Sequence, residues 1–571
     1  MKKNYLLALI CFLSFTGISL SQTTYEWLPT APDANWKQGA AGARWTGGLW
    51  DEPGFGILKF DNNHELTMTN NVAGTYSTHQ IIFGSLNTNA RTISGISGNE
   101  VAFFDFGGAK PKIENQSSGS HTINFPVRIG FNPLEINPVS GNLTIQDLNL
   151  DNNFLDVYGD NTHTLTINGV ISGGTGGVSI QQNSTVIFNG VNTYTGKTTV
   201  NKGNLQVNAD MAGGIEVNND GNLIVDTNLS ITYLTLNDAA TVTIKAGKSI
   251  TLSENLTNNS NNIILEHGAS LIVNGVAIGD LTYNVNILPA TNWHLISSPV
   301  SGQDYNDTWV INNDIASGSD FSTNRGISTY NNTTSTSPHV AGAAGHWRYM
   351  QDGGSGTFGN GVGYSLIKDD NPGVSSGNYS FTGTFQNTDV SPAISQGATN
   401  WNLIGNPYAA YLDIDLFLAE NTTTNNVLAA PFQAIYVWTG LEYNPITADD
   451  DAHIYPGQAF FVNSNVTSGT ANFKTTMQSH ETVGVTFYKN AKSSISLMLS
   501  DGISNKTTKI NYLDSKTAGL DPGFDIGMFN GVSSDLRVYT NLVSNNEGIA
   551  FARQALPNTD LESMVIPVGI I

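Results

Sequence analysis

The chain has 571 residues, only 12% of them charged, and its 24 Lys and Arg face 46 Asp and Glu, which gives a formal net charge of −22. Nucleic acids and anionic membranes are bound through neutralising cations, so this charge balance argues against both as partners. The single cysteine, Cys11, lies near the N-terminus, and the rest of the chain therefore has neither disulfides nor cysteine-ligated zinc.

The first residues have the pattern of a secretory signal peptide. Lys2 and Lys3 form a basic start, Tyr5–Phe15 an apolar stretch, and Ser19-Leu20-Ser21 a small-x-small cleavage site. The apolar stretch is too short to span a membrane as a stable helix, and no comparable run follows. We therefore predict a signal peptide at residues 1–21, no transmembrane segment, and a location outside the cell or at the outer cell surface.

Four tryptophans gather in a Gly-rich segment just after the expected cleavage site: Trp27, Trp36, Trp45 and Trp50. A solenoid needs a cap over its first coil, and packed aromatic side chains suit that purpose. The alternative is a platform on which sugar rings stack, so the four residues are also candidate glycan-binding residues. This segment, up to about residue 160, looks less regular than the one that follows.

From about residue 160 to 275, short β-prone runs recur between Gly and Asn turns. Each run reads apolar–any–apolar, so it buries two side chains on one face. Such rungs bury a core only when stacked, which predicts an all-β protein with a right-handed parallel β-helix over residues 22–285 and two to three strands per coil. An antiparallel sandwich of hairpins is the alternative. The runs are 165–167, 178–180, 186–188, 205–207, 215–217, 223–225, 234–236, 242–244, 250–252, 263–265 and 271–273.

One segment of this ladder carries an unusual string, Asn192-Thr193-Tyr194-Thr195-Gly196, followed by Thr198–Val200. Residues 169–208 around it resemble the autotransporter-associated β-strand repeat, which occurs in secreted passenger regions of bacterial surface proteins. The resemblance implies an exported β-solenoid.

A duplication begins near residue 291. Three landmarks recur in the same order, the first after a shift of 108 residues, and this predicts tandem β-sandwich repeats at 286–395 and 396–481. The alternation of side chains in the second copy suits strands with one face in a core. The paired landmarks are Thr291–Pro299 with Thr399–Pro407, Ile327–Tyr330 with Ile435–Trp438, and Gly361–Tyr364 with Gly457–Phe460.

The second copy resembles a module of large secreted proteins of Bacteroidetes, which are typically exported by the type IX secretion system. Its residues Trp401–Tyr408, Ile435–Trp438 and Tyr455–Val462 carry the resemblance, while the first copy departs from it at Ser297-Ser298, where the module usually has Gly-Asn. The resemblance implies that secretion machinery is a partner of this chain.

Residues 482–571 are predicted to form a C-terminal β-domain. Gly523–Gly527 and Gln554–Pro557 resemble the domain that often precedes the sorting signal of those exported proteins. The last residues, Val565–Ile571, are an apolar run that would end the chain on an unpaired edge. The sequence is therefore expected to be truncated, with a secretion signal in the missing part.

No catalytic constellation stands out in the sequence. It lacks a His-Glu-x-x-His pair and a Gly-x-Ser-x-Gly elbow, and its one Gly-x-Gly-x-x-Gly string, Gly354–Gly359, precedes a predicted strand where a phosphate site needs a helix. No arginine occurs between residues 129 and 324, which argues against cleavage of polyuronates on the solenoid. We predict neither catalytic residues nor a cofactor.

Acidic clusters are the remaining candidates for metal binding. Asp449, Asp450 and Asp451 offer hard oxygen ligands for Ca²⁺, although Asp residues in turns more often bond their own backbone. A second cluster contains Asp151, Asp156 and Asp160. Asp413 and Asp415, which alternate with Leu412, Ile414 and Leu416, are predicted to lie on the solvated face of a strand.

These features predict a non-enzymatic, adhesin-like structural or binding protein, secreted or at the cell surface, with a β-solenoid stalk. Its expected partners are glycans or host and surface macromolecules. The alternative is a carbohydrate-active protein, either a glycan-binding module or a glycoside hydrolase on the β-helix. Two carboxylates about 5–10 Å apart beside exposed aromatics would favour the alternative.

Overall fold

The structure, a computed structural model, describes residues 23–571 apart from 38–42, 47–55, 106–107, 132, 288–291, 319–322, 335–344, 370–376, 481–492, 503, 533–535 and 560. The predicted signal peptide thus lies outside the described residues. The chain is all-β, with 47% strand, 5% helix and a β-solenoid of about 10 turns. Within the described ranges, no helix has the length and apolarity needed to cross a membrane. Two compact units divide the chain, 1–205 and 206–571.

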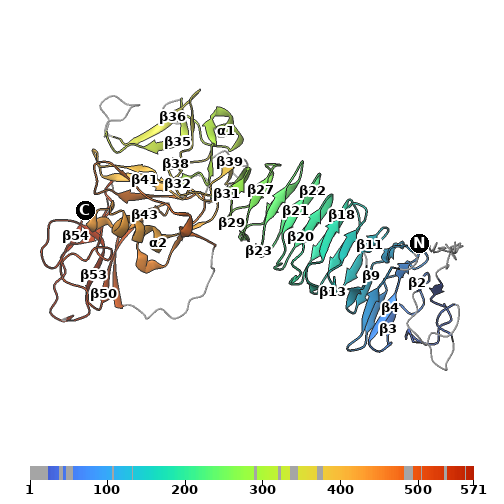
Figure 1. Cartoon of the computed structure of the whole chain (residues 1–571). Coiled ribbons are helices and arrows are strands. Elements are labelled where there is room, and N and C mark those ends of the chain that lie inside the picture. Colours follow the sequence, from blue (N-terminus) through green and yellow to red (C-terminus); the bar gives the residue numbers. More distant parts are fainter. Residues whose placement is uncertain are drawn as a thin grey trace, which may run out of the picture. The chain divides into compact units, whose positions relative to one another are not determined.

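Unit 1 is a parallel β-solenoid with three strands per coil (Figure 1). Strands of successive coils pair in parallel, which confirms the parallel β-helix and rules out the antiparallel alternative for this region. The first sheet contains β1 (Thr24–Glu26), β2 (Ile57–Phe60), β5 (Gln80–Phe83), β8 (Lys112–Asn115), β11 (Leu134–Pro138), β14 (Phe154–Val157), β17 (Gly177–Ile180) and β19 (Thr198–Val200). The second contains β4 (Thr75–Thr78), β7 (Glu100–Phe103), β10 (Val127–Ile129), β13 (Leu148–Asn149) and β16 (Ile171–Ser172). The third contains β3 (Thr67–Asn70), β6 (Thr92–Gly95), β9 (His121–Asn124), β12 (Leu143–Ile145), β15 (Thr164–Ile167) and β18 (Ser184–Phe188), and β20 (Gly203–Val207) spans the unit boundary.

The register of the coils explains why the solenoid has a dry interior and a polar surface. On the first sheet, buried aliphatic side chains stack from coil to coil, from Leu58 to Val200. On the third sheet, five outward threonines stand in register on successive coils, and their hydroxyls keep this face wettable. They are Thr67, Thr92, Thr122, Thr144 and Thr166.

From Ile57 to about residue 160, the described strands recur in the same three parallel sheets as the strands that follow, although the sequence looks less regular there. The coil pattern is hidden in the sequence because polar side chains occupy inward positions there. Asn70, Asn115 and His121 are at most 1% exposed and bond to backbone groups or to neighbouring side chains inside the coils. An inward asparagine that bonds to the backbone of a turn is buried, but a search of the sequence for apolar residues at inward positions does not find it.

His121 is held in one protonation state by its neighbours. Its Nδ1 accepts from the Arg91 backbone N–H at 3.1 Å, so Nε2 carries the proton and donates to Ser117 Oγ at 2.6 Å. A second proton on Nδ1 would face that N–H donor. Burial, together with the nearby Arg91 charge, lowers the pKa of His121 to about 4.

This lowered pKa predicts acid sensitivity in unit 1. The unfolded chain binds a proton at His121 below about pH 6.5, and the folded chain does so only near pH 4. Stability from this group is therefore complete above pH 6.5 and is lost as the pH falls to 4, by up to about 3 kcal/mol. Urea midpoints measured across this range should fall in the parent protein and fall less in His121→Gln. Equal slopes for the two proteins would contradict the prediction.

The Asn-Thr-Tyr-Thr-Gly string serves the architecture of one coil. The Asn192 side chain accepts a hydrogen bond from the Ile171 N–H. It takes the place of a backbone carbonyl at a point where the chain turns between two strands of a coil. Tyr194 is fully buried and its hydroxyl bonds Thr198 Oγ1 at 2.5 Å. A Cβ on Gly196 would lie 2.1 Å from the Gly176 carbonyl oxygen, so only glycine allows the two coils to approach there.

Unit 2 begins with further coils of the same kind, and a strand pair continues one of their sheets into the first repeat. The last long coil strand, β31, pairs antiparallel with β39 of the first repeat over seven residue pairs, from Asp280–Thr384 to Asn286–Asn378. The coil strands are β21 (Ile215–Val217), β24 (Leu234–Leu236), β27 (Leu256–Asn258) and β30 (Ala277–Ile278); β22 (Gly221–Val225), β25 (Thr241–Ile244), β28 (Ile263–Leu265) and β31 (Asp280–Asn286); and β23 (Asn228–Ile231), β26 (Ser249–Leu252) and β29 (Ser270–Val273). The first repeat adds β39 (Asn378–Phe385) and β33 (Val300–Ser301) to the β31 sheet.

The predicted duplication has a direct counterpart in sheet topology. Each copy has a four-stranded antiparallel sheet with the same strand order, and each has a short helix after its first strands. In the first repeat the order is β32 (His294–Ser297), β38 (Gly363–Leu366), β35 (Asn324–Tyr330) and β36 (Trp347–Gln351), with α1 (Asp307–Asn312). In the second it is β41 (Trp401–Gly405), β46 (Ala459–Asn463), β43 (Ile435–Trp438) and β44 (Tyr443–Ile446), with α2 (Ile414–Ala419).

The two repeats contact each other through equivalent positions, as the halves of a two-fold symmetric dimer do. Ser297 N donates to Gly457 O at 3.0 Å, and the equivalent Gly405 N donates to Gly361 O at 3.0 Å. The isolated bridges Ile296–Gln458 and Ile404–Val362 are related in the same way, because each joins a position of one repeat to the equivalent position's partner in the other repeat. Small residues line this seam, since a Cβ on Gly405 would lie 2.5 Å from the Ser297 Cβ.

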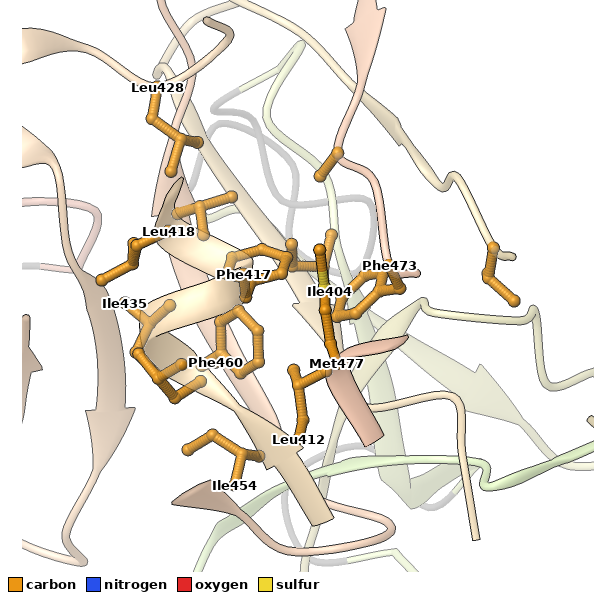
Figure 2. Close-up of a cluster of buried hydrophobic side chains, with 14 of the residues drawn as sticks. Ile404, Leu412, Phe417, Leu418, Leu428, Ile435, Ile454, Phe460, Phe473 and Met477 are labelled. Carbon is orange, nitrogen blue, oxygen red and sulfur yellow. The ribbon is translucent and has the colours of Figure 1, made fainter. Parts of the chain in front are cut away.

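Both faces of the β41 sheet are buried. Ile404, Phe460 and Ile435 face a core closed by α2, by the β45 (His453–Ile454), β42 (Tyr411–Asp413) and β48 (Gln478–Ser479) sheet, and by η4 (Thr475–Met477) (Figure 2). The opposite face, with Trp401 and Leu403, packs in a second core against Leu295 and the C-terminal β-domain. The remaining elements are β34 (Asp304–Asn306) with β37 (Ser355–Thr357), β40 (Ala393–Ile394) with β47 (Gly469–Thr470), η1 (Glu420–Thr424), η2 (Ala430–Phe432) and η3 (Ala448–Asp450).

Leu412 and Asp413 lie on strand β42, but helix α2 begins at Ile414, so the prediction of a strand face was wrong for Asp415. Asp413 caps α2, and its side chain accepts from the Leu416 N–H at 3.0 Å. Ile414, Phe417 and Leu418 are buried at helical spacing, while Leu416 is 47% exposed. An i, i+3, i+4 pattern over six residues is easily mistaken for alternation.

The C-terminal β-domain has the two sequence motifs side by side. Buried Asp525 accepts from the Ala555 N–H at 2.7 Å and from the Asp521 N–H at 2.6 Å, so it ties Gly523–Gly527 to Gln554–Pro557. The end run is paired through β54, although Val565 and Ile570 are exposed. The strands are β49 (Ser493–Ser500), β50 (Asn505–Leu513), β53 (Phe551–Pro557), β52 (Val538–Thr540) and β54 (Val568–Ile570), with β51 (Ile526–Gly527) beside β53.

Candidate functional site

The N-terminal tryptophans form a packed cluster and not an open platform. Trp27, Trp36 and Trp45 are at most 1% exposed, and their rings meet one another edge to face at 5.1 and 6.1 Å. Each also contacts the Phe60 ring on the second strand of the solenoid. A sugar cannot stack on rings that are covered on both faces, so these three residues suit the capping role. Trp50 lies outside the described residues.

The triple Asp is organised by hydrogen bonds within the protein. Asp450 Oδ2 accepts from the Thr447 N–H at 2.8 Å and from Arg553 Nη1 at 2.7 Å, in a capping box at the start of η3. Burial would raise the pKa of Asp450, but these bonds outweigh it and hold the pKa below its usual value. Asp451 has φ = 50°, a turn conformation. The geometry of Asp449–Asp451 therefore gives the predicted calcium site no support.

The second acidic cluster does not converge. Asp151 pairs with Arg128, Asp160 accepts from the backbone of Thr162 and His163, and Asp156 lies on β14. No group of three or more His, Cys, Asp or Glu residues suited to a metal occurs among the residues that the structure describes.

One carboxylate pair does occur on the outer face of the unit 1 solenoid. Glu135 on β11 and Asp156 on β14 stand opposite each other in register, and Lys110 Nζ lies 2.9 Å from Glu135 Oε1 and 3.9 Å from Asp156 Oδ2. Burial raises the pKa of Asp156 although Lys110 opposes the shift. Phe154 on the same strand is 55% exposed. A shared ammonium places the two carboxyl groups within about 7 Å, the range of paired acids in glycosidases.

A cavity of about 380 Å³ lies between the hairpin β43–β44 and the C-terminal β-domain in unit 2. Its size lies in the range of small-molecule sites. Aromatic side chains form one wall: the rings of Trp438 and Tyr443 lie 4.8 Å apart, and those of Tyr443 and Phe529 4.0 Å. We refer to this cavity, with the residues named here and in the next paragraph, as the basic cavity.

Four cations also line the cavity, in a protein with only 24 Lys and Arg. Two are fixed by the protein: Arg553 is paired with Asp450, and Lys506 Nζ donates to the Leu441 carbonyl at 2.8 Å. The other two, Lys509 and Arg537, have no side-chain partner in the part of the chain that the structure describes. Their charges are available to a ligand.

Glu442 is the one acidic residue in the lining. Burial raises its pKa, and this shift persists although the Lys506 charge and a backbone hydrogen bond from Thr507 oppose it. One carboxylate stands among four Lys and Arg side chains in the lining. The cavity therefore has a positive field inside a strongly acidic protein.

This site could not be predicted from the sequence. Its residues come from two separate regions of the chain, Trp438–Pro445 and 496–553, and no motif marks them. Only the spacing of Lys506 and Lys509 on a strand of C-terminal residues is visible, and cations on a strand are ordinary surface features.

Comparison with known proteins gave one match. No curated protein and no solved structure matches the chain. Residues 214–451 match a family described as Domain of unknown function (DUF8693). The match begins one residue before β21 and ends beside η3, so what this chain has in common with that family is the end of the solenoid, the first repeat and most of the second.

Proposed function

We propose that this chain is an exported, non-enzymatic binding protein in which the β-solenoid is a spacer and the basic cavity is the ligand site. The observation that carries the proposal is the cavity itself, which combines an aromatic wall with two cations that have no side-chain partner among the described residues. The solenoid supports the spacer role, because its inward side chains fill a core and its outward threonines form a uniform polar face. A role in adhesion to glycans or surface macromolecules follows from this arrangement.

Export rests on the signal-peptide pattern of residues 1–21 and on the resemblance to type IX substrates. A reporter fused after residue 21, expressed in a bacterium with that secretion system, should be delivered across the inner membrane. Retention of the reporter in the cytoplasm would contradict this part of the proposal.

The binding role is tested by applying the purified chain to a glycan array while it is screened for turnover of plant and algal polysaccharides. We expect binding without release of products, and we expect Trp438→Ala to reduce the binding because it removes part of the aromatic wall. Product release by the parent chain would replace the proposal by an enzymatic one.

Carbohydrate cleavage on the solenoid is the second candidate function, and the Glu135–Asp156 pair favours it. In that mechanism Asp156, with its raised pKa, supplies the proton and Glu135 acts as the carboxylate partner. If turnover is observed, Glu135→Gln and Asp156→Asn should each abolish it, and the exposed Asp226→Asn should not.

A further inference from the structure

We infer that the ligand of the basic cavity is an acidic glycan, a sugar chain that carries carboxylate or sulfate groups. This inference rests on the proposed binding role of the same cavity and adds the chemical class of its ligand. Three properties of the cavity lead to it: the charge of the lining, the aromatic wall and the polar groups between them.

The charge selects an anion. Lys509 and Arg537 have no side-chain partner among the described residues, whereas Arg553 is neutralised by Asp450 and Lys506 lies near Glu442. The guanidinium of Arg537 presents a planar set of donors that matches a carboxylate or sulfate. A neutral ligand would leave both cations of the lining without a counter-charge.

The aromatic wall selects a ring. Trp438 and Tyr443 are half-buried and form one surface with the Phe529 ring. Flat aromatic surface stacks on the apolar face of a sugar, while the Trp and Tyr polar atoms stay at its edge. A small inorganic anion would not use this wall.

The polar groups select hydroxyls. Asn444, Ser496 and Thr507 line the cavity, and Asn444 and Thr507 are exposed to its solvent side. Amide and hydroxyl groups both donate and accept, which is the pattern that sugar hydroxyls need. A ring with hydroxyls and an anionic substituent satisfies all three parts of the lining.

The test is calorimetric titration of the full chain with three oligosaccharides of equal length: an oligogalacturonate, a sulfated galactan fragment and a neutral cello-oligosaccharide. We expect the acidic probes to bind more weakly as salt rises and the neutral probe not to bind. The first two arms distinguish carboxylate from sulfate as the recognised group.

Four variants make the result specific. The double change Lys509→Glu with Arg537→Glu should weaken acidic-probe binding by at least about tenfold, and Lys245→Glu, the same charge change at an exposed solenoid residue, should leave it unaltered. Glu442→Gln removes the one acidic lining residue and should strengthen binding. Lys509→Gln retains a polar side chain and keeps the test interpretable if the double variant fails to fold.

The possible failures are distinguishable. If the neutral probe binds as well as the acidic ones and only Trp438→Ala weakens it, the acidic class is wrong and the binding role stands. If an acidic peptide displaces the sugars, the ligand is a protein and the inference is also wrong. If no probe binds and the glycan array is empty, both the inference and the proposed function are overturned.

Discussion

Replacing Trp401 by alanine is expected to lower the free energy of unfolding of unit 2 by about 3–5 kcal/mol. Trp401 is 1% exposed and lies between the second repeat and the C-terminal β-domain. Its ring contacts those of Tyr436 and Phe529 at 4.8 and 4.5 Å, and its Nε1 donates to Asn530 Oδ1 at 2.7 Å. Alanine leaves a cavity, and it also leaves that amide without its donor.

The duplication supplies the control for this change. Trp293 holds the equivalent position in the first repeat but is 37% exposed and touches one ring, that of Tyr349. Trp293→Ala should therefore cost less than about 1 kcal/mol. Calorimetry of both variants should show a shift of several degrees in the unit 2 transition for Trp401→Ala and a small shift for Trp293→Ala. Equal shifts would mean that the second core does not depend on Trp401.

Arg91→Ala is the second large change, and it is expected to destabilise unit 1 by about 3–5 kcal/mol. The Arg91 guanidinium is fully buried, lies 5.2 Å from the centre of the Phe60 ring, and donates to the carbonyls of Asn62, His64 and Glu65. Glu65 has φ = 50°, so this turn is strained and the arginine holds it. Removal leaves the carbonyls without their donor and opens a void under the turn.

Arg128 is the matched control in the same unit. Like Arg91, it lies over an aromatic ring, that of Phe104, and it makes ion pairs with Glu100 at 2.7 Å and Asp151 at 3.2 Å. Its side chain is 25% exposed, so its ion pairs are screened by solvent and Arg128→Ala should cost about 1 kcal/mol or less. Urea unfolding of Arg91→Ala and Arg128→Ala checks this difference in stability. Similar urea midpoints would show that the turn at Glu65 does not depend on the buried Arg91 guanidinium.

The solenoid could be predicted from the sequence where apolar residues fill both inward positions of a rung. All eleven runs between residues 165 and 273 are strands, as their pattern predicted. The individual strands of the earlier coils were not predicted because Asn70, Asn115 and His121 occupy inward positions there. These polar side chains form hydrogen bonds inside the coil and interrupt the apolar pattern. The same limit explains why the strand predicted through Asp415 was wrong: the strand ends at Asp413, and the six residues of α2 are too few to separate a period of two from one of 3.6.

The candidate site shows a different limit. The aromatic wall and the cations of the basic cavity lie in regions that only tertiary packing brings together. Local sequence patterns do not show which distant residues line the same cavity. Lys509 has the features of any exposed lysine until the fold places Arg537 at the same cavity. The tryptophans near the N-terminus show the converse, since a cluster in the sequence was open to two interpretations and burial decided between them.

The self-matching seam between the two repeats has a practical consequence for dissecting this protein. A cut between residues 395 and 396 looks like a cut at a linker, but it would separate Ser297 from Gly457 and Gly405 from Gly361 at once. Each freed half would expose the same glycine-lined patch and would be prone to meet another copy of itself through it. Fragments intended to be monomeric should therefore retain both repeats. A fragment that contains only one repeat is expected to self-associate through the exposed contact surface.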